Sequence, residues 1–125
     1  MKKSVDLKIG DKTFTLCFTI KALSELERLE GRSLILLINA LVSNPGAFMN
    51  LMTVDFLVHA LNTGLVDKPK DFDAYDFIDA YCAQEDATLD DLMEGVLKGI
   101  LASGLFTLGS PERNAAQINR ILGLE

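Results

Sequence analysis

Two short stretches near the start of the chain alternate apolar and polar residues, which is the two-residue period of half-buried strands. Gly10 and Asp11 lie between them and can supply the positive φ that a tight hairpin turn requires. We expect an antiparallel β-hairpin over residues 4–18, either with Ile9 opposite Phe14 or with a two-residue loop. Both registers have the same parity, so the apolar side chains share one face in either case. These side chains are Val5, Leu7, Ile9, Phe14, Leu16 and Phe18.

The chain then changes to the 3.6-residue apolar period of helices, interrupted by capping residues. Thr19 is expected to cap a helix that ends near Glu30, where Gly31 stops it. Ser33 is expected to cap a second helix, residues 34–43. This helix is apolar nearly all round, and the pattern therefore predicts that it lies at the centre of the core.

Further helices are expected downstream. One is capped by Thr53 and ends at Gly64, and another covers residues 72–83. A capping box of the Thr–Asp kind at Thr88 predicts the start of the next helix. A last helix is expected to begin with Pro111 at its first position.

This order of elements predicts one domain, residues 1–125, of the α+β class and mainly helical. The N-terminal antiparallel β-hairpin, about residues 4–18, is expected to pack on a bundle of five or six helices in residues 19–125. Apolar residues make up 49% of the chain and charged residues 24%, both ordinary for a globular domain. No apolar run approaches the roughly 18 residues of a membrane span, and the N-terminus lacks the apolar stretch of a signal peptide. Cys17 and Cys82 are far apart, and we expect reduced thiols and a reducing cytoplasm.

The net charge of −6 is unevenly distributed. Residues 67–94 hold ten acidic residues and two lysines, a net charge of −8. Asp73, Asp76 and Asp79 lie opposite the apolar residues of their predicted helix. Because like charges three residues apart repel, this stripe is either a solvated face that keeps the protein soluble or a docking face for a basic partner. A basic footprint is absent, so no nucleic-acid partner is expected.

Small residues recur at every fourth position of the helix that begins at Thr88, namely at Gly95, Gly99 and Ser103. They leave a smooth strip that another backbone can approach closely, either within the fold or as a groove for a partner. The candidate partner-binding residues are therefore Asp73, Asp76, Asp79, Gly95, Gly99 and Ser103, together with the edge of the hairpin.

The search for catalytic and metal sites gives no positive result. His59 is the only histidine, and we expect it to be solvated or bonded at the surface, because Asp55 one turn away supplies only half of a metal site. A calcium loop beginning at Asp71 would need glycine and glutamate where Asp76 and Cys82 stand. We predict no metal, no cofactor, no catalytic residue and no enzymatic activity.

One stretch carries a family resemblance. "IGDKTFTLCFTIKALSELE", a hairpin running directly into a helix, followed by "SLILLINAL", resembles the small tail assembly chaperones of tailed bacteriophages and prophages. These lambda-type proteins are encoded between the tail tube and tape-measure genes. The resemblance covers the first third of the chain, and the remainder matches in size, helical content and acidic character.

The resemblance implies a non-catalytic protein that binds the long, helical tape-measure protein and keeps it soluble during tail tube assembly. It also implies a place in the host cytoplasm, absence from the mature virion, and a longer frameshifted form that recruits tail tube protein. The free edges of the hairpin are compatible with a homo-oligomer, and no membrane association is expected.

Two other classes of function stay open. An acidic decoy or inhibitor would present phosphate-like charge to a basic or DNA-binding partner, which explains the aspartates but not the hairpin. A small metabolic enzyme would need a ligand site near His59.

Overall fold

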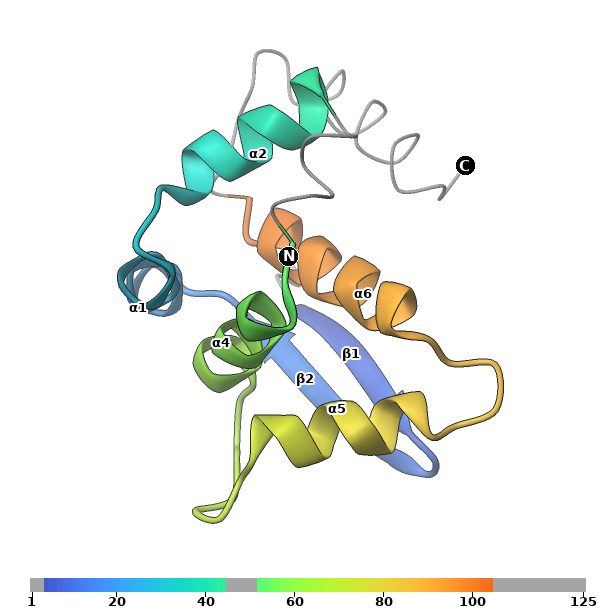
Figure 1. The fold of residues 1–125 in the computed structure, drawn as a ribbon. Coiled ribbons are helices and arrows are strands. Elements are labelled where there is room, and N and C mark those ends of the chain that lie inside the picture. Colours follow the sequence, from blue (N-terminus) through green and yellow to red (C-terminus); the bar gives the residue numbers. More distant parts are fainter. Residues whose placement is uncertain (1–3, 45–51, 105–125) are drawn as a thin grey trace.

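The computed structural model describes residues 4–44 and 52–104, which form a β-hairpin and five helices. The predicted α+β, mainly helical architecture is confirmed. In Figure 1, α4, α5 and α6 surround the hairpin, α1 lies beside α4, and α2 lies at the outer end. The helix expected from Pro111 falls outside the described residues. The elements are β1 (Ser4–Ile9), β2 (Lys12–Cys17), α1 (Ile20–Glu30), α2 (Leu34–Ser43), α4 (Val54–Gly64), α5 (Ala74–Cys82) and α6 (Leu89–Ala102).

The two strands of the hairpin are joined by the shorter of the two loops considered. Ile9 pairs with Lys12 and Leu7 with Phe14, so the pairing of Ile9 with Phe14 is wrong. Gly10 has a φ of +60°, and this conformation at the first turn position closes a two-residue loop and so lengthens the ladder. The prediction that the apolar side chains share one face is confirmed, because Leu7 and Leu16 are both buried on the helix side of the hairpin.

Phe18 anchors the hairpin to the helices. Its ring is 2% exposed and lies between Gly64 of α4 and Gly99 of α6. A Cβ atom at Gly64 would lie 2.5 Å from the Phe18 ring, and one at Gly99 would lie 3.2 Å from it. Both glycines therefore allow a close approach that a side chain would prevent, and this approach fixes where β2 meets the bundle.

Every described helix begins at a side-chain cap. The hydroxyl of Thr19 accepts a hydrogen bond from the Ala22 N–H at 3.1 Å, and Ser33 and Thr53 do the same for their own helices. The Thr88 capping box is complete. The predicted helix over residues 72–83 begins later, because Asp73 is its cap rather than part of its first turn.

The prediction that α2 is central to the core is wrong. Ile35 and Leu36 are 57% and 68% exposed, whereas Leu34, Leu37 and Ile38 are buried. The start of α2 is held to α1, where the Glu27 carboxylate accepts a hydrogen bond from the Leu34 N–H at 2.8 Å. Because α4, α5 and α6 already surround the hairpin, α2 is left with one side to pack and one side in solvent.

Candidate interaction surfaces

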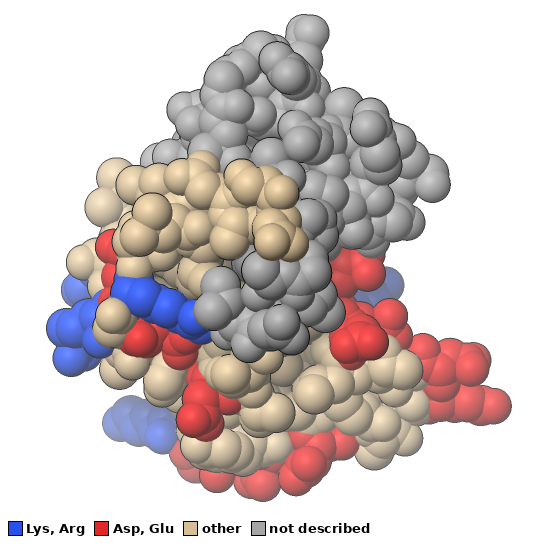
Figure 2. All heavy atoms as spheres, turned by 45° about the horizontal axis from the view of Figure 1, so that its top comes forward, with Lys and Arg blue, Asp and Glu red and all other residues tan. Residues whose placement is uncertain are grey.

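The acidic residues of the α5–α6 half are concentrated on the surface. Asp73, Asp76 and Asp79 are all exposed, as predicted from the helical period. Figure 2 shows acidic side chains along the lower and right-hand edges of the face it presents, with basic side chains mainly at the left. Among the described residues, the only ion pair that engages an acid of residues 67–94 joins Glu94 to Lys98 at 3.6 Å. The acidic residues within 67–94, called the acidic surface below, therefore keep most of their charge unneutralised.

The three aspartates of α5 have different local roles. The Asp73 carboxylate accepts hydrogen bonds from the N–H groups of Tyr75 at 2.8 Å and Asp76 at 3.4 Å, so it stabilises the helix start. Asp76 lies in the first turn, where the helix dipole favours a negative charge. Asp79 lies in the last turn, where the dipole disfavours it. Helix stability therefore accounts for Asp73 and Asp76 but not for Asp79.

The small-residue strip of α6 faces the hairpin. A Cβ atom at Gly95 would lie 2.8 Å from Leu7 Cδ2, and one at Gly99 would contact Phe18 and Leu16. Ser103 is 2% exposed and its hydroxyl donates to the Ile100 carbonyl at 2.6 Å. Of the two interpretations of the strip, close packing within the fold is therefore realised. Binding of a partner at these positions stays a prediction.

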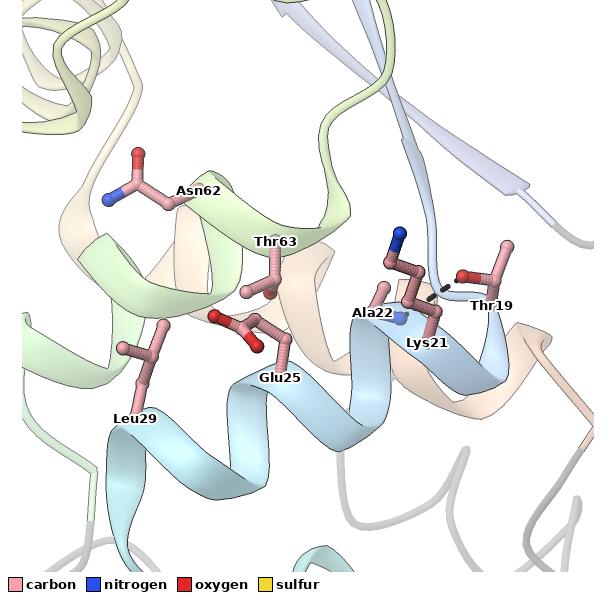
Figure 3. Close-up of a pocket in the computed structure, with 7 residues that line it drawn as sticks. All are labelled: Thr19, Lys21, Ala22, Glu25, Leu29, Asn62 and Thr63. Carbon is pink, nitrogen blue, oxygen red and sulfur yellow. Dashed lines mark hydrogen bonds between the residues drawn. The ribbon is translucent and has the colours of Figure 1, made fainter.

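A groove of about 340 Å³ runs between α1 and α4 (Figure 3). Its polar side chains are largely engaged by their own helices: Thr19 caps α1, and the Thr63 hydroxyl donates to the His59 carbonyl at 2.9 Å. Glu25 pairs with Arg28, whose hydrogen bond lowers the pKa of that carboxyl group. The groove is lined by Thr19, Lys21, Ala22, Glu25, Leu29, Asn62 and Thr63.

Large apolar side chains are exposed on α1 and α2. Ile20 is 70% exposed and Leu29 is 38% exposed on α1, and Ile35 and Leu36 are the exposed residues of α2. Leu29 also lines the groove between α1 and α4. These four residues, called the apolar residues of α1 and α2 below, lie on elements that carry none of the acids of residues 67–94.

His59 has a partner that the sequence did not indicate. Its Nδ1 lies 2.7 Å from a carboxylate oxygen of Glu30, and the other oxygen of Glu30 accepts a hydrogen bond from Arg32 at 2.9 Å. The Glu30 side chain is only 7% exposed. Of the two predicted states of His59, solvated or bonded at the surface, the structure shows the bonded one, with Glu30 as the partner. Sequence reasoning missed this contact because the two residues are 29 positions apart.

The described residues do not meet the requirements of a metal site or of a disulfide. Within residues 4–44 and 52–104, no three histidine, cysteine or acidic side chains lie together as metal ligands would. Cys17 and Cys82 are both free thiols.

Comparison with protein-family models, curated proteins and solved structures gave no match. In the described part of the chain, every helix is too short or too polar to cross a bilayer.

Proposed function

We propose that this chain is a non-catalytic tail assembly chaperone of a tailed bacteriophage or prophage, which binds the tape-measure protein and keeps it soluble while the tail tube assembles. The observation that carries the proposal is the hairpin, which lays one apolar face on the helices and continues through the Thr19 cap directly into α1. The family resemblance depends on this arrangement. The proposed location is the host cytoplasm, with tail tube protein as a second partner through a longer form.

The distribution of surface chemistry supports a chaperone. A protein that holds a long, aggregation-prone helical partner needs exposed apolar side chains for contact and an excess of one charge for solubility. The apolar residues of α1 and α2 meet the first need, and the acidic surface on α5 and α6 meets the second. The two lie on different elements of the chain.

The state of the polar groups supports a non-catalytic role. Glu25 and Arg28, which shift each other's pKa, form an ion pair on the surface of α1. Glu30, the acid beside the histidine, is held by Arg32 and His59 and does not line the groove between α1 and α4. Its contacts therefore join α1 to α4 rather than present a reactive group to a ligand.

Co-expression with the tape-measure protein that the proposal places in the neighbouring gene tests the proposal. We expect the soluble yield of that protein to rise with the wild-type chain and to fall when Ile35 and Leu36 are both changed to Ser. Because both side chains are exposed, the change removes contact surface without opening the core. The matched control changes Val66 and Leu89, exposed apolar residues outside α1 and α2, to Ser. An unchanged yield with the wild-type chain would refute the proposal.

The exposed aspartates of α5 favour an acidic decoy as a second candidate. Asp76→Lys with Asp79→Lys tests it while leaving the Asp73 cap intact. If the chain is a decoy, this double variant releases a DNA-binding target and leaves tape-measure solubility unaffected. If the stripe instead docks the tape-measure protein, the double variant lowers its soluble yield, and added salt weakens the wild-type complex.

A further inference from the structure

The outer edge of β1 is partly closed by the side chain of Gln84, which follows α5. The carboxamide of Gln84 donates to the Lys8 carbonyl at 3.0 Å and accepts from the Gly10 N–H at 2.8 Å. It therefore offers one donor and one acceptor, as the peptide group of a neighbouring strand does. The Lys8 carbonyl thus points away from β2. Because peptide groups alternate in direction along an antiparallel strand, those of every second β1 residue also point away from β2.

A groove of about 370 Å³ lies beside β1, and its lining includes Lys8, which Gln84 contacts. Four consecutive β1 residues, 5–8, form one side of it. Gly95 also lines it, and its lack of a side chain lets Leu7 pack directly against α6. The remaining lining residues are Tyr81, Asp91, Glu94 and Lys98.

The opposite edge of the hairpin differs. There the Thr15 carbonyl accepts a hydrogen bond from the Val66 N–H at 3.0 Å, and Leu16 forms a bridge with Leu65. The chain leaving α4 therefore covers the edge of β2. Figure 1 shows β1 on the other side of the hairpin, beside α6. The β1 edge combines outward peptide groups with a groove.

The groove is negative on its α6 side. Asp91 is exposed and Glu94 half-buried, and Lys98 is engaged by Glu94. The pKa of Tyr81 is raised, first by burial and then by the charge of Asp91, with a smaller effect of Glu94. The Asp6 carboxylate on β1 accepts from the Thr15 hydroxyl at 2.9 Å, so that side chain is engaged within the hairpin. The net charge of −8 over residues 67–94 extends the same field beyond the groove.

We infer that the outer edge of β1 binds an extended, basic segment of a partner polypeptide, which adds as a third strand beside residues 5–8. Main-chain pairing supplies the contact, the acidic side of α6 selects basic side chains, and Gln84 ends the pairing at Lys8. A second copy of this chain fits less well, because it would bring its own acidic region to the same groove. The inference does not depend on the proposed function, since tape-measure binding was assigned to α1 and α2.

Two matched proline variants test the edge. Lys8 and Thr13 are direct cross-strand partners, both exposed, and their N–H groups face opposite edges of the hairpin. Proline lacks the N–H and is tolerated on the outer side of an edge strand. The probe is a labelled decapeptide of alternating Lys and Val, and binding is followed by fluorescence anisotropy. Lys8→Pro should weaken binding at least about tenfold, although it removes a repelling charge, while Thr13→Pro should leave it unchanged.

A charge reversal gives a second measurement that leaves the strand intact. Glu94→Lys should weaken the Lys–Val peptide and strengthen a Glu–Val peptide of the same length. Asp90→Lys, an exposed change on the same helix outside the groove, is the control. The inference is overturned if the Lys–Val peptide shows no saturable binding to the wild-type chain, or if both folded proline variants bind it equally. Self-association of the wild type that Lys8→Pro abolishes would assign the edge to a second copy and overturn it as well.

Discussion

Replacing Gly64 with Ala tests the account of how the hairpin is held. A Cβ atom there would lie 2.5, 2.6 and 3.0 Å from three atoms of the Phe18 ring, whereas carbon atoms in contact lie about 3.5–4.0 Å apart. The ring must therefore move by about 1 Å or the end of α4 must shift. A Cβ atom at Gly99 would also lie 3.2 Å from the same ring, so α6 packs closely against the ring as well and limits how far it can move. Overpacking of this kind destabilises by about 1–3 kcal/mol.

The stabilisation that alanine gives over glycine in a helix is small at this position. Alanine is favoured over glycine by about 1 kcal/mol in a helix interior, but Gly64 is the last residue of α4. We therefore expect a net loss of about 1–3 kcal/mol in the free energy of unfolding. Urea unfolding followed by circular dichroism measures it as a lower midpoint with an unchanged slope. Ala80→Gly, at an exposed helical site, reports the intrinsic difference between the two residues.

A double variant separates overlap from other effects. Phe18→Leu removes the ring that a new Cβ atom would strike, so Gly64→Ala should destabilise much less in that background. The expected coupling between the two changes is about 0.5–3 kcal/mol. The reasoning is refuted if Gly64→Ala is at least as stable as the wild type, or if the two changes are additive.

Three further predictions concern named side chains. Glu30→Gln should destabilise by about 1–3 kcal/mol, because this nearly buried carboxylate joins two helices, while the exposed Glu25→Gln should change little in the same urea experiment. Thr88→Ala should cost about 1 kcal/mol and speed amide exchange in the first turn of α6. Ultraviolet titration should give Tyr81 a pKa above the ordinary 10, which Glu94→Gln lowers. Since folding raises the pKa of Tyr81, the neutral Tyr81 side chain contributes fully to stability below pH 10. This contribution is lost as the pH rises through the pKa of Tyr81 in the folded protein.

The candidate surfaces were predicted from the sequence to different degrees. The helical period was enough to put Asp73, Asp76 and Asp79 on an exposed face, because it depends only on neighbours within one element. Spacing alone also revealed the smooth strip of Gly95 and Gly99, but not that the hairpin occupies it. The groove beside β1 was not predicted, since its two sides come from segments more than 80 residues apart.

The sequence by itself determined the described strands and helices and several of their ends, although α5 begins after Asp73 rather than at residue 72. Strand alternation, the Gly10 turn and the caps at Thr19, Thr53 and Thr88 each depend on atoms a few residues apart, so local chemistry is sufficient. The tertiary structure alone decided the contacts that cross the chain. Gln84 contacts β1 residues more than 70 positions away. The helix α2 lies at the outer end because α4, α5 and α6 surround the hairpin. Such contacts depend on how elements pack in space, a property that no single segment carries.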